Sequence, residues 1–303
     1  MEAMLHRVRP LDRRALLLIV LLCLCWGLYQ VSVKVASAEV PPLLQAAARS
    51  IGSAVLVILW CRLRSVPLFQ RDGTLAAGLL AGIGFAVEFA FIYLGIALTD
   101  VSRATLLIYL SPFVVAIGAH VLVPGDRLTR AKMAGLLAAF GGLVLVFSGG
   151  TAGGEAHFAG DILCVLGAVA WGAVTLLIKV SRLAHIAAEK ILFYQLAVSA
   201  LLLPLVALVL GEHLPALPSP IAFAALAYQI VVVSFASYIV WFWLITQYAP
   251  SHLASFTFLT PASSVLFGGL LLHEPVSRQI MLALLLIGGG IWLVNRSRKS
   301  DVP

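Results

Sequence analysis

The sequence predicts an all-α integral membrane protein: ten transmembrane helices that form two inverted five-helix repeats, with the N- and C-termini in the cytoplasm. The first observation behind this prediction is composition. Hydrophobic residues make up 62% of the 303 residues, charged residues only 11%, and the mean hydropathy is +1.06. Soluble domains carry roughly 25% charged residues, so most of the surface of this chain must face lipid. The other two observations are a repeated pattern and an uneven distribution of basic residues.

Ten apolar segments are each long enough to cross a bilayer, which takes about 20 residues at a rise of 1.5 Å per residue. In the first half we expect helices over 15–33, 43–61, 75–98, 102–123 and 131–149. In the second half we expect them over 160–179, 189–210, 219–245, 252–272 and 279–295. The connections are short, so we expect no separate soluble domain.

A pattern in the first expected helix recurs in the sixth. Trp26-Gly27 is followed by Lys34, and Trp171-Gly172 is followed at the same spacing by Lys179. Likewise, Leu110-Ser111-Pro112 in the first half matches Leu259-Thr260-Pro261 in the second. A membrane chain with two similar halves is typical of a transporter whose site lies between the repeats. We expect the repeats to cover residues 11–150 and 156–297.

The basic residues set the orientation. With an even number of helices, both termini lie on one side, and most of the 20 Lys and Arg residues fall on that side. Only Lys34, Arg103 and Arg278 fall on the other side, and Arg49 falls within the second helix. Basic loops stay in the cytoplasm. Because each half has an odd number of helices, the halves must insert in opposite orientations, which is the symmetry of carriers that work by alternating access.

Several spaced residues resemble the EamA branch of the drug/metabolite transporter superfamily. The matching positions in the first half are Trp26, Gly27, Lys34, Arg49, Ser111-Pro112, Asp126, Gly135 and Gly141-Gly142. Those in the second half are Trp171, Gly172, Lys179, Thr260-Pro261, Glu274 and Gly288 to Gly290. The chain departs from the family pattern at Gln195, where an Arg is expected, and at Asp126, where Glu is commoner; both departures bear on the substrate. The resemblance implies a ten-helix secondary carrier that moves amino acids or other small metabolites, often outward, without ATP.

Glu88 is a carboxylate in the middle of the third expected helix, where a charge costs roughly 2.5 kcal/mol or more. Its helical neighbours Ala81, Gly84 and Gly95 are small, so we expect this face to pack closely on another helix. One hypothesis is that Glu88 binds a cationic group of the substrate, and another is that it carries a coupling proton. The structural alternative is a protonated carboxyl that is hydrogen-bonded between helices.

Arg49 is the other charge placed deep in an apolar segment. Its planar guanidinium is suited to a substrate carboxylate, and it is also a candidate partner for Glu88. The alternative is a snorkelling or purely structural side chain. If both charges line one cavity, a zwitterion is the natural ligand.

Aromatic residues within the apolar segments are further candidates for substrate binding, because small-molecule sites are lined mainly by apolar and aromatic side chains. Their alternative role is packing and anchoring at the membrane interface. The candidates are Trp26, Tyr93, Tyr109, Trp171 and Tyr238.

Pro112 and Pro261 each fall within an expected helix. Each removes a backbone donor and frees the carbonyl one turn earlier, at Ile108 and Thr257. The hydroxyls of Ser111 and Thr260 are candidates to re-satisfy the local backbone. We expect these prolines to act as hinges; the alternative is a static kink.

The predicted function is secondary active transport in the inner membrane by alternating access, with export of an amino acid or an amino-acid-derived zwitterion, including opine- or metallophore-type compounds. One alternative is uptake of a vitamin or cationic metabolite such as riboflavin or a quaternary amine, and another is a membrane enzyme or a non-transporting scaffold. We expect no catalytic residues, cofactor, metal site or nucleic-acid partner. The expected partners are a small-molecule substrate and the bilayer, with proton coupling and a homodimer left open.

Overall fold

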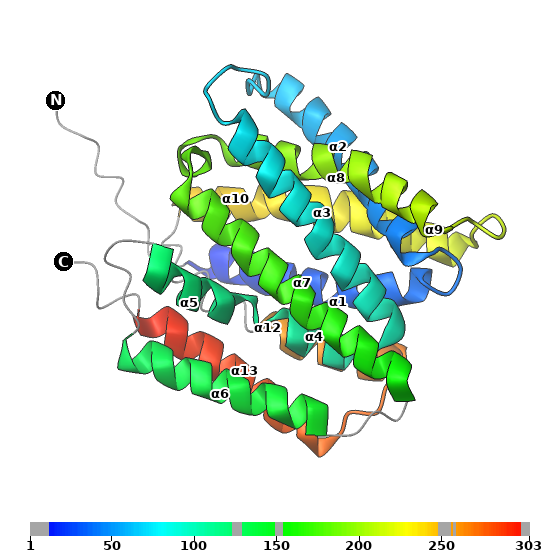
Figure 1. Cartoon of the computed structure of the whole chain (residues 1–303), viewed down its shortest axis with the longest axis vertical. Coiled ribbons are helices and arrows are strands. Elements are labelled where there is room, and N and C mark those ends of the chain that lie inside the picture. The colour runs from blue at the N-terminus through cyan, green and yellow to red at the C-terminus, as the bar shows by residue number, and fades with distance from the viewer. Residues whose placement is uncertain (1–11, 123–128, 149–153, 248–255, 257–258, 298–303) are drawn as a thin grey trace.

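The computed structural model describes residues 12–122, 129–148, 154–247, 256 and 259–297, and every regular element in these ranges is helical. In the first half these elements are α1 (Arg13–Ala36), α2 (Pro42–Leu63), α3 (Leu75–Leu98), α4 (Val101–Ile108), α5 (Ser111–Leu122) and α6 (Arg130–Ser148). In the second half they are α7 (Gly154–Val180), η1 (Arg182–His185), α8 (Ala188–Val209), α9 (Pro220–Ala227), η2 (Tyr228–Ser237), α10 (Tyr238–Gln247), α12 (Leu259–Leu271) and α13 (Arg278–Ser297). Figure 1 shows them as one helical bundle.

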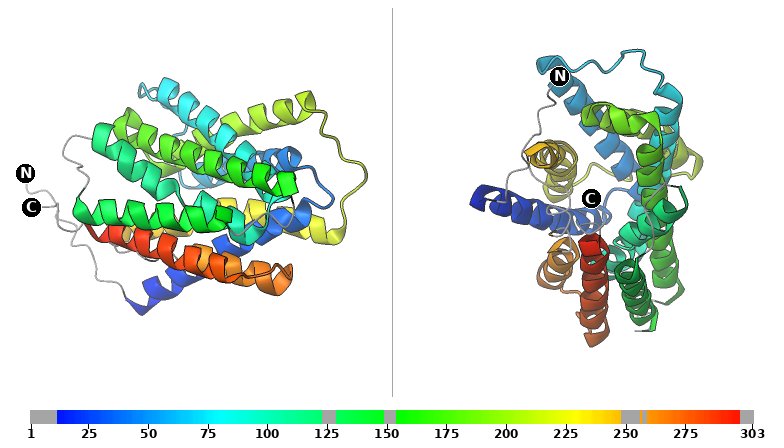
Figure 2. Two further views of the ribbon diagram at one scale, coloured as in Figure 1. Left: turned by 60° about the horizontal axis from the view of Figure 1, so that its bottom comes forward. Right: turned by 90° about the vertical axis from the view of Figure 1, so that its left-hand side faces the viewer.

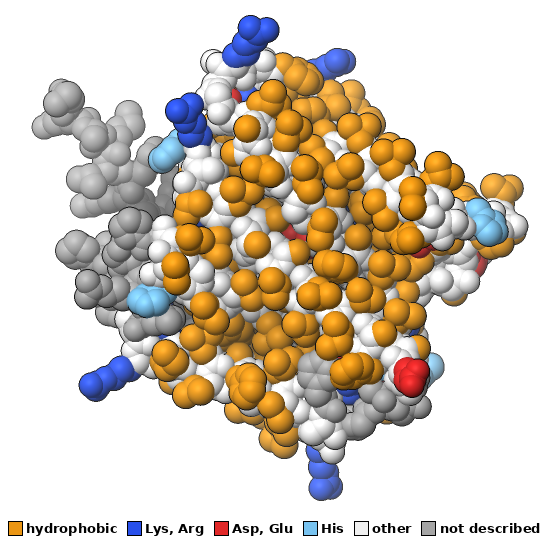
Figure 3. All heavy atoms as spheres, viewed as in Figure 1, with side chains coloured by type: hydrophobic (Ala, Val, Ile, Leu, Met, Phe, Trp, Pro, Cys, Tyr) orange, Lys and Arg blue, Asp and Glu red, His pale blue; other side chains and the backbone are white. Residues whose placement is uncertain are grey.

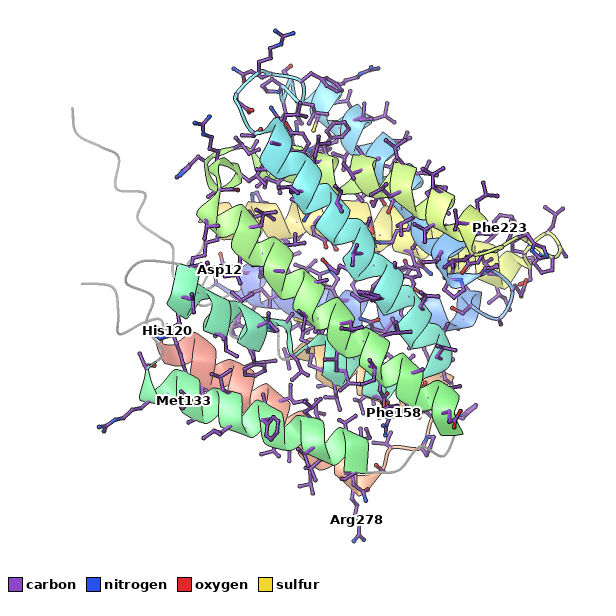
Figure 4. All side chains as sticks on the ribbon, in the orientation of Figure 1. Asp12, His120, Met133, Phe158, Phe223 and Arg278 are labelled. Carbon is purple, nitrogen blue, oxygen red and sulfur yellow. The ribbon has the colours of Figure 1, made fainter. Side chains whose placement is uncertain are left out.

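Seven helical stretches of the described chain are long and apolar enough to cross a membrane. They are α1, α2, α3, α4 with α5, α7, α8 and the stretch Pro220–Trp241. Two further helices, Leu259–Leu271 and Arg278–Leu293, are apolar but shorter. Figure 3 shows that the visible face is mostly hydrophobic, with blue Lys and Arg side chains at its margins. In Figure 4, Met133 and Phe223 point away from the bundle; they are 45% and 53% exposed, as lipid-facing side chains are.

Two of the expected helices are interrupted. The expected segment 102–123 forms α4 and α5, which are separated at Tyr109 and Leu110. Pro112 lies in the first turn of α5, where its missing N–H leaves no intrahelical bond unmade. The chain therefore leaves the α-helix before the proline, and Pro112 starts a new helix. The expected segment 219–245 forms α9, the π-helix η2 and α10, and the π-helix was not predicted from the sequence.

Packing between the two halves is reciprocal. The first helix of one half packs on the fourth segment of the other, because α1 packs on α12 and α7 packs on α4 and α5. The equivalent helices α2 and α8 pack on each other, as do α6 and α13. Figures 1 and 2 both show α6 beside α13. The same pairs recur when the halves are exchanged, which fits two similar repeats.

Polar contacts gather at one end of the bundle, which we call the Lys34 end; those of Lys34 lie within the first half, and those of Glu274 join the two halves. The Nζ of Lys34 in α1 donates to the carbonyls of Ile96, Ala97 and Thr99, at 3.0, 3.1 and 2.7 Å, and so caps the C-terminus of α3. The carboxylate of Glu274 accepts from the backbone N–H groups of Val101 and Ser102, at 2.7 and 3.1 Å. A carboxylate at the α4 N-terminus satisfies orphan N–H donors there.

Three further pairs tie the halves together at the same end. Arg103 of α4 forms a buried ion pair with Asp161 of α7, whose carboxylate also accepts from the Thr99 hydroxyl at 2.8 Å. Glu212 accepts from the backbone N–H groups of Leu43 and Leu44 at the start of α2. Between the loops, Glu39 accepts from the backbone and hydroxyl of Ser219, and these bonds lower the pKa of Glu39.

The opposite end, which we call the Asp72 end, has its own contact between the halves. Lys190 of α8 donates to the carboxylate of Asp72 and to the carbonyl of Gln70, both at 2.8 Å. Thr74 donates to Asp72 through its hydroxyl at 2.5 Å and through its backbone N–H at 3.1 Å. These bonds, first of all the one from Lys190, lower the pKa of Asp72 to about 2.

Candidate functional site

Arg49 is buried in the middle of the bundle with 1% of its surface exposed. It lies on the buried face of α2, one turn from Ala46 and Ser53. Its guanidinium carbon is 3.9 Å from the ring centroid of Phe89, and 5.7 and 5.9 Å from those of Phe85 and Tyr29. The guanidinium is thus surrounded by aromatic rings.

Within the part of the chain that the structure describes, the N–H groups of Arg49 have no hydrogen-bond partner, and Nε and Nη1 are fully buried. Burying a charge costs several kcal/mol after relaxation. Cation–π contacts return about 2 kcal/mol when desolvated. The rings therefore offset only part of the cost, and an anion at Arg49 would supply the missing interaction.

Glu88 is also buried, with 4% of its surface exposed. The small residues around it pack as expected: a Cβ at Gly84 would meet Val174, and one at Gly95 would meet Cys164, both on α7. Over the described residues, Glu88 makes neither a hydrogen bond nor an ion pair. The expected interhelical hydrogen bond and a direct pair with Arg49 are therefore both missing there. The two charges still interact electrostatically across the bundle.

Tyr93 is fully buried and joins two side chains that the sequence analysis did not select. Its hydroxyl donates to Oε1 of Gln229 at 2.8 Å, and Nε2 of Gln229 donates to Oε1 of Gln45 at 3.2 Å. The ring packs 6.3 Å from Tyr29 and 6.2 Å from Phe89, centroid to centroid. Tyr93 therefore borders the rings that cover Arg49.

The structure also shows which residues sequence reasoning missed around Arg49. Tyr29, Phe85 and Phe89 gave no signal, because aromatic residues are ordinary in apolar helices. Gln45 and Gln229 did carry one: both are amides within apolar segments, and each must find partners there. A search for every polar side chain inside the expected helices would have selected them.

Tyr238 opens α10 directly after the π-helix η2 and interacts electrostatically with both Arg49 and Glu88. Short π-helical segments often occur at functional sites. Of the predicted binding residues, the structure thus brings together Arg49, Glu88, Tyr93 and Tyr238, which come from α2, α3 and α10.

The remaining predicted aromatic residues have other neighbours. Trp26 is half-buried, donates through Nε1 to the Ser237 hydroxyl at 2.9 Å, and packs edge-on against Trp241 at 5.5 Å between ring centroids. Tyr109 packs edge-on against Trp171 at 6.1 Å. Trp171 is 37% exposed. The two tryptophans thus have unequal environments.

Pro261 is buried in the first turn of α12, as Pro112 lies in the first turn of α5. The carbonyl of Thr257, which we expected Pro261 to free, lies outside the described residues. Among the described residues the hydroxyl of Thr260 bonds to no backbone carbonyl, so the expected backbone bond is not formed there; it faces the side chains of Cys23 and Tyr109. Instead, the Ser263 hydroxyl lies 3.0, 2.9 and 3.0 Å from the carbonyl oxygens of Leu259, Thr260 and Cys23, which share its one proton.

No group of three or more His, Cys, Asp or Glu side chains in the described ranges could hold a metal ion.

Comparison with known proteins decides the family. The model of the EamA-like transporter family matches the chain twice, over residues 13–148 and 158–296. The chain belongs to this family. It is therefore a member of the drug/metabolite transporter superfamily, as the repeated motifs predicted.

Several proteins named as transporters are similar to this chain over nearly their whole length. The uncharacterized transporter YoaV of Bacillus subtilis (strain 168) is 25% identical over 92% of this chain and 96% of its own. The uncharacterized inner membrane transporter YedA of Escherichia coli (strain K12) is 24% identical over 90% of this chain and 88% of its own. A probable amino-acid metabolite efflux pump of Salmonella typhimurium (strain LT2) is 25% identical over 93% and 95%.

One crystal structure shares the fold, with a TM-score of 0.66 and 22% sequence identity over 95% of this chain and 99% of the other. Family membership, the seven long apolar helices and the inner-membrane relative together identify the EamA protein described here as a multi-pass transporter of the inner membrane.

Proposed function

We propose that this EamA protein exports an amino acid or an amino-acid-derived zwitterion by alternating access. Its two repeats, 11–150 and 156–297, insert in opposite orientations as ten transmembrane helices with both termini in the cytoplasm. The reciprocal packing of α1 on α12 and of α7 on α4 and α5 supports this arrangement. Such repeats rock between states that open to opposite sides of the membrane.

The observation that carries the proposal is the buried guanidinium of Arg49, which has aromatic neighbours and no hydrogen-bond partner in the described structure. A substrate carboxylate matches its planar donors. Glu88 has no ion-pair partner among the described residues and interacts electrostatically with Arg49, so its carboxyl group is available to a positive group of the substrate. A ligand with one negative and one positive group fits both. The similarity to a probable amino-acid metabolite efflux pump supports the same substrate class.

The carboxylate of Glu88 has a second candidate role as a proton carrier, because it is a buried acid with no partner in the described residues. Transport by Glu88→Gln over a range of pH separates the roles. A proton carrier predicts loss of the pH dependence for every substrate. A substrate ligand predicts weaker transport of ammonium-bearing compounds with the pH dependence retained. Glu155→Gln, at an exposed glutamate of α7, is the matched control.

The direct test starts by finding the cargo. Metabolites are profiled inside and outside cells that lack or overproduce the protein, and each compound that changes is then measured in liposomes containing the purified protein. We expect a zwitterion to accumulate inside cells that lack the protein, and its liposome flux to fall at least tenfold in Arg49→Gln. Arg64→Gln is the matched control, because Arg64 follows the same helix, is exposed, and stacks on Trp60 at 4.8 Å. A cargo without a carboxylate, or equal flux in both variants, refutes the proposal; such a cargo would favour the uptake of a cationic metabolite.

A further inference from the structure

A chain of hydrogen bonds runs from Tyr93 to the Lys34 end of the bundle. Tyr93 donates to Gln229, and Gln229 donates to Gln45. The Nε2 of Gln45 then meets the carbonyls of Val40 and Val33, at 3.1 and 3.4 Å, and the hydroxyl of Ser37 at 2.9 Å. Tyr93, Gln229 and Gln45 each have 0% of their surface exposed, so neighbouring groups of the protein set the direction of each bond.

The carbonyls at the far end fix that direction. A backbone carbonyl only accepts, so Gln45 must turn its NH₂ group toward Val33 and Val40 and its Oε1 toward Gln229. The NH₂ group of Gln229 must then face Gln45, and its Oε1 must face Tyr93. If the Gln229 amide were flipped, two acceptors would meet without a proton, which costs the desolvation of a buried polar group. The hydroxyl of Tyr93 is therefore the donor in its bond to Gln229.

This direction determines what Tyr93 offers to a third partner. A phenol has one proton, and that of Tyr93 lies in the bond to Gln229, so the Tyr93 oxygen can only accept from a third partner, either the neighbouring Tyr29 hydroxyl or a substrate. Tyr93 packs on Tyr29 and Phe89, the rings that also contact Arg49. The guanidinium presents only donors. The neighbourhood thus combines a donor-only group with an acceptor-only group.

We propose that Gln229 is a positioning residue that, held by Gln45, keeps Tyr93 acceptor-only and thereby selects substrates that carry an N–H donor such as an ammonium group. The inference rests on the proposed function, because it takes the surroundings of Arg49 as the binding site. A tyrosine hydroxyl that is free to donate would bind a carboxylate or carbonyl of the substrate equally well. With its proton committed, Tyr93 favours amino acids over the corresponding acids that lack the amino group.

The first arm of the test measures the Tyr93 bond without any substrate. Infrared spectra of the full-length protein with ring-deuterated tyrosine are recorded, and the Tyr93→Phe spectrum is subtracted to isolate the Tyr93 C–O stretch. We expect the band of a donating phenol in the wild type and a shift in Gln229→Leu. Gln229→Glu is the conservative control, because a protonated carboxyl can still accept from Tyr93 and donate to Gln45. A band that is the same in wild type and Gln229→Leu overturns the proposal.

The second arm measures selectivity with defined probes. Binding of leucine and phenylalanine is compared with that of 4-methylpentanoate and 3-phenylpropanoate, by tryptophan fluorescence of the solubilised full chain. Since a hydrogen bond to a charged group contributes about 1.5–3 kcal/mol, we expect at least a tenfold preference for the amino acids. The preference should fall about tenfold in Tyr93→Phe and Gln229→Leu and persist in Gln229→Glu.

The outcomes separate this inference from the proposed function. A preference that survives in both Tyr93→Phe and Gln229→Leu overturns the role of Tyr93, even if export of a zwitterion is established. If the wild type binds none of the four probes, leucine and phenylalanine are excluded as substrates, and the infrared arm alone decides whether Gln229 holds the Tyr93 proton.

Discussion

Removal of the Arg49 charge should stabilise the empty protein while abolishing transport. The variant is Arg49→Met, which keeps the length and much of the apolar contact with Phe89 while removing the guanidinium. In the structure this guanidinium is 3.9 Å from the Phe89 ring and unpaired within the described residues. A buried charge costs several kcal/mol, and the aromatic contacts return about 2 kcal/mol.

The difference predicts a gain of about 1–3 kcal/mol in the free energy of unfolding, which is a rise in Tm of several degrees. The assay is thermal unfolding of the ligand-free protein in detergent, alongside liposome flux. Arg64→Met is the control: Arg64 is exposed and stacks on Trp60, so its loss should change stability by less than about 1 kcal/mol and leave flux intact. If Arg49→Met lowers Tm by more than Arg64→Met does, Arg49 is a structural residue and the reasoning fails.

Three further predictions concern the framework. Asp72→Asn should lower Tm at pH 7, and the difference in Tm from wild type should shrink as the pH falls from about 4 toward 2. The folded pKa of Asp72 lies below its usual 3.8, so the stabilisation is lost as the carboxylate is protonated. A Tm difference that does not change over this pH window contradicts the Lys190 contact. Glu274→Ala should cost about 0.5–2 kcal/mol by removing the acceptor at the α4 N-terminus, and a melting curve equal to that of Glu155→Ala would count against it. Gly95→Ala should lower the free energy of unfolding by about 1–3 kcal/mol, because the new Cβ would lie 3.0 Å from the backbone oxygen of Gly160 on α7. Gly288→Ala, with open space around the new Cβ, should be neutral or stabilising. Equal Tm values for the two variants would contradict the close packing of α3 on α7.

The helices were predictable because hydrophobic length is a strong signal in a chain that must cross lipid. The segment expected over 75–98 forms α3 with the same bounds, Leu75–Leu98. The break between α4 and α5 was foreseeable only as a consequence of Pro112, and its position at Tyr109 and Leu110 depends on how α4 packs against α12 and α7. The π-helix η2 left no local signal, because an i→i+5 pattern has no residue preference comparable to that of proline or glycine.

The candidate site was predictable in part for the same reason. Deep charges are costly in a membrane, so Arg49 and Glu88 were identifiable one at a time. Their neighbours were not, because the contacts of Arg49 with Phe85 and Phe89 join two helices, and the bond from Tyr93 to Gln229 joins residues of different halves. Such contacts depend on helix rotation and tilt, which apolar segments of nearly uniform hydrophobicity do not specify. Trp26 and Trp171, which hold matching positions in the two repeats, also differ, because Trp26 is bonded to a serine and Trp171 is 37% exposed.

The measurement closest to the central claim is the liposome flux of the compound that accumulates in cells lacking the protein, compared between wild type, Arg49→Gln and Arg64→Gln. The account predicts a zwitterionic compound whose flux falls at least tenfold in Arg49→Gln and is unchanged in Arg64→Gln. Flux of such a compound at the wild-type rate in Arg49→Gln would contradict the assignment of Arg49 as the receptor for its carboxylate.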